Sequence, residues 1–235
     1  MSTTNNLTST DEATLRFTAG YAVLTAITFS MVASAPTPIY RLYQETLGLT
    51  PLAITLIFAI YSITIIAAFL TVARLSDFIG RKPMIFAALL LNMLALALFI
   101  EANTSKVLMV ARAIQGVATG IALATLGALI ADAAPKAAAV LNSVTALIGL
   151  MVGSITAGSL AAYLPWPTQL VFALLLCVML AEMIALHFIH ETASYKAGAM
   201  SVLRPNLQIP AAALRPMLRL FPLTLSGWAL GGFCH

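Results

Sequence analysis

Six long apolar segments, separated by short polar or proline-containing stretches, dominate the hydrophobic pattern of the chain. They cover residues 17–39, 50–72, 83–100, 107–131, 137–164 and 168–189. An α-helix needs about 20 apolar residues to cross a hydrocarbon core of about 30 Å, and most of these segments reach that length. The pattern therefore predicts an all-α polytopic membrane protein in which residues 17–189 form a bundle of six transmembrane helices.

The stretches outside this bundle have a different composition. Residues 1–16 are rich in Ser, Thr and Asn, which predicts a short disordered cytoplasmic tail. Residues 190–219 are polar and interrupted by prolines, as expected of a cytoplasmic linker. Residues 220–235 are apolar again but too few for a complete span, so we expect them to be the truncated start of a seventh transmembrane helix.

The first apolar segment has two interpretations. The sequence Ala33-Ser34-Ala35 has the small residues of a signal-peptide cleavage site. However, the preceding tail is not basic and the apolar run is too long for a signal peptide, so an uncleaved first helix is favoured. Pro36 and Pro38 are expected to kink or end that helix.

Composition supports the membrane class and excludes several others. Apolar residues make up 61% of the 235 residues and charged residues only 9%, which is far from the balance of a soluble domain. Cys177 and Cys234 lie in apolar segments and provide neither a disulfide framework nor metal-ligand spacing. The sequence has no nucleotide-binding loop, metal-ligand cluster or nucleophile–base pair, so we expect neither an enzyme nor a cofactor.

The distribution of cations predicts the orientation in the membrane. The net charge of +4 does not indicate nucleic-acid binding, because the cations are scattered over the turns. With a cytoplasmic N-terminus, the outer turns carry only Arg41 and Lys106, while Arg112 falls within a span. The inner segments then carry the remaining cations, Arg16, Arg74, Arg81, Lys82, Lys136, Lys196, Arg204, Arg215 and Arg219. Since cations favour the cytoplasmic side, the pattern predicts a cytoplasmic N-terminus.

A short polar turn, residues 73–83, separates the second and third spans, and we call it the motif turn. As a basic cytoplasmic turn it could simply fix the topology. Its sequence also resembles the signature G-x-x-x-D-[RK]-x-G-R-[RK] of the major facilitator superfamily of transporters. The matching residues are Asp77, Gly80, Arg81 and Lys82, whereas Ala73 and Phe78 depart from the signature. Gly80 supplies the positive-φ position that such a turn usually needs.

The fourth span holds a cation about 9 Å below its outer end, taking 1.5 Å per residue. Arg112 there requires a polar partner or a water-filled cavity, unless its side chain snorkels to the outer interface. The pattern R-x-x-Q-G-x-x-x-G, formed by Arg112, Gln115, Gly116 and Gly120, is similar to the helix-4 motif of the same superfamily. The resemblance implies a role of the arginine in proton coupling and of the glycines in close helix contact.

Weaker signals accompany these two motifs. The glycines of residues 149–158 are similar to an antiporter signature, although Ser154 replaces its proline, so the direction of transport stays open. Asp132 is placed to meet Arg81 or Arg74. With Glu191, which follows the sixth span, it could form the charged inner latch of the superfamily. The alternative is a set of solvated surface ions contributing about 0–1 kcal/mol per pair.

Glu182 is the only acidic residue well inside a predicted span. Intramembrane carboxylates are candidates for function, so Glu182 is a candidate proton site. It lies about 12 Å deeper than Arg112, which argues against a direct pair. An interfacial position near the helix end is the favoured interpretation.

The resemblance implies half of a twelve-helix transporter, with a substrate cavity between two six-helix halves. From it we expect a proton-coupled secondary transporter of a small organic solute, placed in the bilayer of a bacterial inner membrane. The chain would then need a C-terminal six-helix half to complete the cavity. The alternative is a truncated membrane fragment with no transport activity of its own.

Overall fold

The computed structural model describes residues 9–72, 75–189 and 191, and this part of the chain consists of α-helices joined by short turns. It belongs to one compact unit, Met1–Arg204. A second unit, Pro205–His235, lies outside the described residues, as do the predicted linker and the predicted start of a seventh helix, apart from Glu191.

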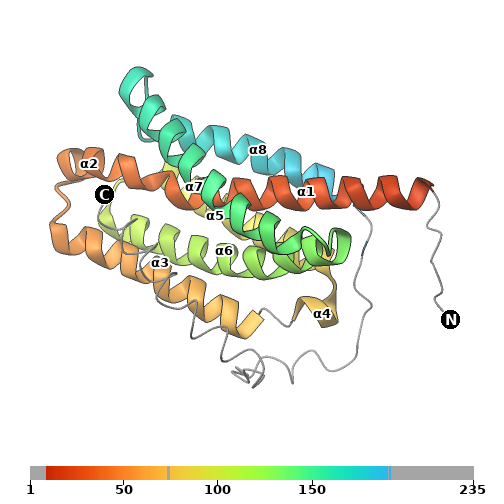
Figure 1. The fold of residues 1–235 in the computed structure, drawn as a ribbon. Helices are drawn as coiled ribbons and strands as arrows, with labels where there is room; N and C mark the ends of the chain where they lie inside the picture. The colour runs from red at the N-terminus through yellow and green to blue at the C-terminus, as the bar shows by residue number, and fades with distance from the viewer. Residues whose placement is uncertain (1–8, 73–74, 190, 192–235) are drawn as a thin grey trace. The chain divides into compact units, whose positions relative to one another are not determined.

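Successive long helices run alongside one another in opposite directions, so that the turns gather at the two ends of the bundle (Figure 1). In chain order the helices are α1 (Ser9–Ser34), α2 (Pro36–Leu47), α3 (Pro51–Val72), α4 (Ser76–Ile79), α5 (Arg81–Ile100), α6 (Ser105–Ala133), α7 (Ala138–Tyr163) and α8 (Leu170–Leu186).

Five helical stretches of the described residues are long and apolar enough to cross a membrane. They are Ala13–Leu47, which joins α1 to α2, and the helices α3, α5, α6 and α7. The prediction of an all-α polytopic membrane protein is therefore confirmed. The sixth predicted span is shorter than expected, since its helix, α8, has only 17 residues instead of the 22 of residues 168–189. It starts only after the turn containing Trp166, and its end tightens into i→i+3 hydrogen bonds that reach Ile189.

The N-terminal helix is longer than the sequence predicted. It begins at Ser9, so residues 9–16, which were expected to be disordered, are helical. Residues 12–16, Glu-Ala-Thr-Leu-Arg, include good helix formers and allow the apolar helix to extend toward the N-terminus.

The helix breaks at Ala35, as the two prolines predicted, and continues as α2. Pro36 has no N–H to donate to the carbonyl of Val32, which is freed from the helix ladder. Gly48, at φ 62°, then ends α2 in the left-handed conformation.

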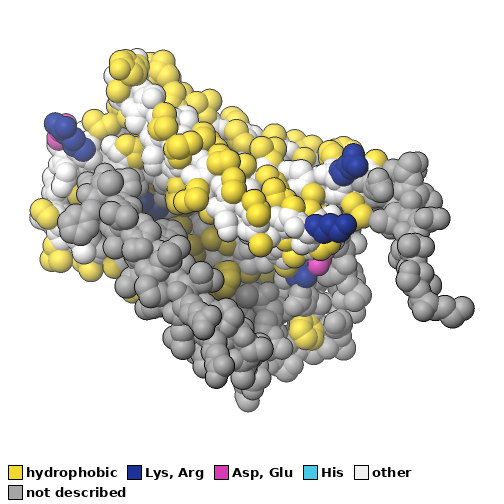
Figure 2. Space-filling model, viewed as in Figure 1, with side chains coloured by type: hydrophobic (Ala, Val, Ile, Leu, Met, Phe, Trp, Pro, Cys, Tyr) yellow, Lys and Arg dark blue, Asp and Glu magenta, His cyan; other side chains and the backbone are white. Residues whose placement is uncertain are grey.

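Helix α6 lies at the centre of the packing, in contact with α1, α3, α5 and α7. Stacked rings of Phe99 and Phe172, with centroids 4.8 Å apart, join α5 to α8. Figure 2 shows apolar side chains along the length of the visible face, while its prominent Lys and Arg side chains lie near the ends. This distribution suits a bilayer, where apolar side chains contact the lipid and cations reach the interfaces. Cys177 is exposed on α8.

Candidate functional site

The motif turn connects α3 to α5 and includes the short helix α4. Its predicted glycine, Gly80, has φ 108° and ψ 156°, a conformation that is essentially restricted to glycine. Helix α5 starts directly after Gly80, so the backbone N–H groups of Arg81 and Lys82 are left without partners inside the helix. The turn therefore presents hydrogen-bond donors at the start of α5.

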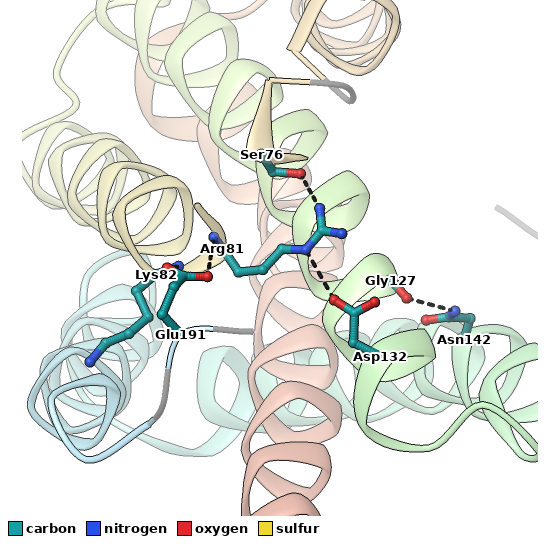
Figure 3. A network of polar contacts seen from close by, with 7 residues as sticks. All are labelled: Ser76, Arg81, Lys82, Gly127, Asp132, Asn142 and Glu191. Atoms are coloured by element: carbon teal, nitrogen blue, oxygen red, sulfur yellow. Dashed lines mark hydrogen bonds and ion pairs between the residues drawn. The ribbon is translucent and has the colours of Figure 1, made fainter. Parts of the chain in front are cut away.

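Glu191, which follows α8 in the chain, supplies the acceptors. One carboxylate oxygen accepts from the N–H of Arg81 at 2.7 Å and the other from the N–H of Lys82 at 2.9 Å (Figure 3). A carboxylate at this position also interacts favourably with the helix dipole of α5. The residues predicted as parts of two separate motifs are thus brought together, and the end of the sixth span is tied to the start of the third.

The side chain of Arg81 makes a second connection, to α6. Its Nε lies 3.2 Å from Oδ2 of Asp132, and its Nη1 donates to the hydroxyl of Ser76 at 2.6 Å. Arg81 is only 9% exposed, which protects the pair from solvent screening on the arginine side. Of the two partners considered for Asp132, Arg81 makes the contact. Arg74 and the side chain of Asp77 lie outside the described residues.

A double-mutant cycle tests the contact between Gly80 and Glu191. A Cβ at position 80 would lie 2.7 Å from Oε2 of Glu191, so Gly80→Ala should cost both backbone strain and this clash, about 2–4 kcal/mol in total. In the Glu191→Ala background the clash disappears, and the cost should fall by about 1 kcal/mol or more. Unfolding of the purified protein in detergent measures the four free energies.

Gly48→Ala is the matched control for this cycle. Gly48 also has a positive φ, but no atom lies within 4 Å of its hypothetical Cβ. Its substitution should therefore cost strain alone and be additive with Glu191→Ala. If the cost of Gly80→Ala is equally independent of Glu191, the carboxylate does not occupy this position.

Arg112 lies in α6 and is 1% exposed, so the snorkelling interpretation is wrong. Its Nε donates to the hydroxyl of Tyr40 at 2.7 Å, and its Nη1 donates to Oε1 of Gln115 at 2.7 Å and to the carbonyl of Ala33 at 3.1 Å. We call Arg112, Gln115 and Tyr40 the Arg112 cluster. It connects α6 to the point where α1 breaks and α2 begins.

Gln115 explains why the cluster lies at this break. Its Nε2 donates to the carbonyl of Val32 at 2.9 Å, and this is the carbonyl that Pro36 leaves without its helical partner. An unsatisfied carbonyl inside a membrane costs several kcal/mol, so the amide of Gln115 stabilises the broken helix. Residues 32 and 36 carried this signal in the sequence, but the partner on α6 could not be inferred from it.

Aromatic rings enclose the guanidinium of Arg112. Its Cζ lies 5.0 Å from the ring centroid of Tyr61 and between 5.5 and 5.9 Å from the centroids of Tyr40, Phe58 and Phe99. Five helices, α1, α2, α3, α5 and α6, thus contribute a hydrogen-bond acceptor or an aromatic ring around one positive charge, and the rings add cation–π attraction. These ring residues were not predicted as part of the site, because their spacing along the chain does not reveal a common centre.

The glycines of the helix-4 motif contact α3. Hypothetical Cβ atoms at Gly116 and Gly120 would each lie 2.7 Å from a backbone carbonyl of α3, those of Tyr61 and Ile65. Glycine is therefore what allows the two backbones to approach so closely, as a small-x-x-x-small pair does in membranes. Gly149 and Gly153 of α7 approach α1 in the same manner.

Glu182 lies away from both groups. It is 4% exposed and is held against α1, so its side chain is buried within the bundle, while its position near an interface stays a prediction. Its Oε1 is 2.5 Å from the hydroxyl of Thr28, and the hydroxyl of Tyr21 donates to its backbone carbonyl at 3.1 Å. Its carboxyl group makes no contact with Arg112, in agreement with their different depths.

A cavity of about 430 Å³ opens between α1, α3, α6 and α7. Its lining is mostly apolar and carries no formal charge, with polar groups from Ser30, Asn142 and Thr145. The amide of Asn142 donates to the carbonyl of Gly127 at 3.4 Å, which places this part of the lining near the C-terminal end of α6 and the N-terminal end of α7. Cavities of this size accommodate small organic molecules.

The membrane-length helices and the cavity between them define the class as a polytopic membrane protein with room for a small molecule. The chain belongs to the Major Facilitator Superfamily, whose family model matches residues 22–235. It is 28% identical over 167 residues to "Multidrug resistance protein MdtL" of Shewanella sp. (strain ANA-3). That alignment covers 69% of this chain and 41% of the relative, so the chain matches less than half the length of that protein.

Proposed function

We propose that the protein is a proton-coupled secondary transporter of small organic solutes and that this chain forms one wall of its substrate cavity. Membership of the superfamily supports transport in general. The observation that carries the proposal of proton coupling is the buried Arg112 cluster at the break between α1 and α2. Because this fixed charge lies at a helix break, a change in the charge of a neighbouring group can alter the angle between the two helical segments.

The guanidinium of Arg112 keeps its charge at every physiological pH, because arginine is not deprotonated in proteins. It therefore stabilises the ionised form of a carboxylate that comes near it and weakens its hold when that carboxylate binds a proton. The hydrogen bonds from Arg112 to Ala33 and from Gln115 to Val32 transmit such changes to α1. In this way proton binding would bias the angle between α1 and α2.

Contacts at the motif turn would stabilise one of the two conformations of the transporter. The Arg81–Asp132 pair and the carboxylate of Glu191 hold the starts or ends of α5, α6 and α8 together at one end of the bundle. A transporter that alternates between two states needs contacts that stabilise one of them and break in the other. We propose that these residues are that latch, with Asp77 and Lys82 of the motif turn contributing to it.

The cavity favours neutral, largely apolar solutes. None of its lining residues carries a charge, and Asn142, Ser30 and Thr145 offer hydrogen bonds to a polar group of the solute. The name of the relative, a multidrug resistance protein, agrees with a broad set of organic compounds. A second six-helix half would close the cavity from the opposite side, and the bacterial inner membrane, with a cytoplasmic N-terminus, is the proposed location.

The experiment that tests this function is transport into proteoliposomes containing the complete protein. Chloramphenicol serves as a neutral amphiphile and ethidium as a cationic dye of similar size. An imposed pH gradient should drive accumulation of chloramphenicol more than of ethidium, and a protonophore should abolish it. Equal movement with and without the gradient would contradict proton coupling, and movement of neither compound would contradict the proposed substrate class.

A further inference from the structure

A polar seam runs between α1 and α8, away from the Arg112 cluster and from the cavity lining. We call Tyr21, Thr28 and Glu182 the α1–α8 seam. All three side chains are at most 6% exposed. Two hydrogen bonds cross the seam, one from the Tyr21 hydroxyl to the backbone of Glu182 and one between Thr28 and the Glu182 carboxyl group.

Counting hydrogens favours a protonated Glu182. The Thr28 hydroxyl lies 3.2 Å from the carbonyl of Leu24 and 2.5 Å from Oε1 of Glu182, but it has a single hydrogen. The carbonyl of Leu24 can only accept. If Thr28 donates to Leu24, as threonines in helices commonly do, the contact with Glu182 is a hydrogen bond only when the carboxyl group donates. The protonated form satisfies both contacts.

The surroundings of the second carboxyl oxygen support the same assignment. Oε2 of Glu182 is buried and has no hydrogen-bond partner among the described residues. An ionised carboxylate there would be a buried charge without a cation or a second donor, which is strongly unfavourable. A neutral carboxyl oxygen without a partner is much less unfavourable than an unpaired buried charge. Binding a proton is therefore the less costly state.

Apart from Tyr21 and Cys177, the other titratable or charged groups on the packed helices lie near the helix ends. On α1 the groups are Asp11, Glu12 and Arg16, toward its N-terminus, and Tyr21, whose hydroxyl donates to the backbone carbonyl of Glu182. On α8, Cys177 is exposed, and His187 lies just past the helix end, more than one turn after Glu182. Helix α7 contains no Asp, Glu, Lys, Arg or His.

Helix α5 presents an amide rather than a charge at this level. Asn92, fully buried, donates to the sulfur of Met179, one turn before Glu182, at 3.5 Å. The cations of α5, Arg81 and Lys82, lie at its first turn, where the Nζ of Lys82 reaches the carbonyl of His187 at 3.4 Å. Neither cation forms an ion pair with Glu182.

We propose that the α1–α8 seam is a proton-binding site, in which Glu182 holds a proton while α1 and α8 are packed together and exchanges it during the transport cycle. The second part of this inference rests on the proposed function. Glu182 lies about 6 Å from the end of α8, close enough to an interface for exchange once the seam opens. Thr28 belongs to the same helix that Arg112 and Gln115 hold at its break, so a change there moves the partner of Glu182.

Infrared difference spectroscopy of the complete protein in lipid tests proton binding without any need for transport. The spectrum at neutral pH should contain a C=O stretching band of a protonated carboxylic acid. Glu182→Gln should remove this band, because glutamine replaces the acid without changing its shape. Thr28→Val should shift the band to the frequency of a less hydrogen-bonded acid, whereas Thr28→Ser should leave it in place. The exposed Glu101, replaced in Glu101→Gln, is the matched control and should not affect it.

The possible outcomes separate this inference from the proposed function. A wild-type band that survives in Glu182→Gln, or a spectrum without such a band, overturns the proton-binding site. If the band is lost in Glu182→Gln but this variant still accumulates chloramphenicol along a pH gradient, exchange at Glu182 during transport is overturned and proton-coupled transport stands. Loss of accumulation in Glu182→Gln, with chloramphenicol still equilibrating in the absence of a gradient, supports both parts. A band in a wild-type protein that shows no proton-driven accumulation supports the site and contradicts the proposed function.

Discussion

Arg112→Ala is expected to abolish proton-driven accumulation while chloramphenicol still equilibrates across the membrane. The substitution removes the fixed charge at the helix break and three hydrogen bonds, those to Tyr40, Gln115 and Ala33. Buried acceptors left without a donor cost about 1–3 kcal/mol each, so the variant should also unfold more easily. Initial rates of uptake, normalised to folded protein and measured over a range of imposed pH gradients, separate lost coupling from lost stability.

Two variants control for this result. Arg112→Lys keeps the charge but loses the planar fork, so it should retain part of the dependence on the pH gradient. Arg41→Ala removes an exposed cation of α2, whose side chain is 86% exposed, and should transport as the wild type does. If Arg112→Ala accumulates chloramphenicol against its gradient at the wild-type rate, Arg112 has a purely structural role.

Gly116→Ala is expected to destabilise the bundle by about 1–3 kcal/mol, although alanine is the better helix former. The added methyl group would lie 2.7 Å from the backbone carbonyl of Tyr61, which cannot move without moving α3. Gly120→Ala should have a similar effect, because its methyl group would meet the carbonyl of Ile65. Thermal unfolding in detergent, followed by the loss of monodisperse protein, measures the change.

Gly20→Ala is the control for helix propensity. Gly20 lies within α1, and no atom lies within 4 Å of its hypothetical Cβ, so this substitution should leave the stability unchanged or raise it by up to about 1 kcal/mol. A Gly116→Ala variant that unfolds at or above the wild-type temperature would contradict the close contact between α3 and α6.

Most helix boundaries could be predicted, because local signals specify them. Thr50 and Pro51 predicted the start of α3, where the Thr50 hydroxyl accepts from the N–H of Ala53 at 3.2 Å. The start of α1 and the end of α8 were predicted less well. At both of these boundaries the apolar pattern changes gradually. Helix propensity decides where α1 begins, and the geometry of the last turn decides where α8 ends.

Local signals in the sequence also predicted part of the candidate site. The motif turn and the Arg112 motif are continuous in the sequence, so a resemblance could identify them. The aromatic rings around Arg112 come from separate helices, and hydrophobic periodicity does not distinguish a ring that faces a cation from one that faces lipid. For Glu182, the residue type alone predicted a candidate proton site. Its place near the end of a span favoured an interfacial position, because its partner on α1 could not be inferred from the sequence.

By itself, the sequence determined the class of protein, the positions of most spans, the break at Pro36 and the need for glycine at position 80. Each of these depends on residues that are close in the chain, since apolar length, a missing N–H and a positive φ are local properties. Only the tertiary structure decided which groups meet. Glu191 at the start of α5, Gln115 at the carbonyl of Val32 and Thr28 at Glu182 join residues far apart in the sequence. Such pairs depend on how the helices rotate and pack, because a buried polar group can be paired only by a group on whichever helix lies next to it.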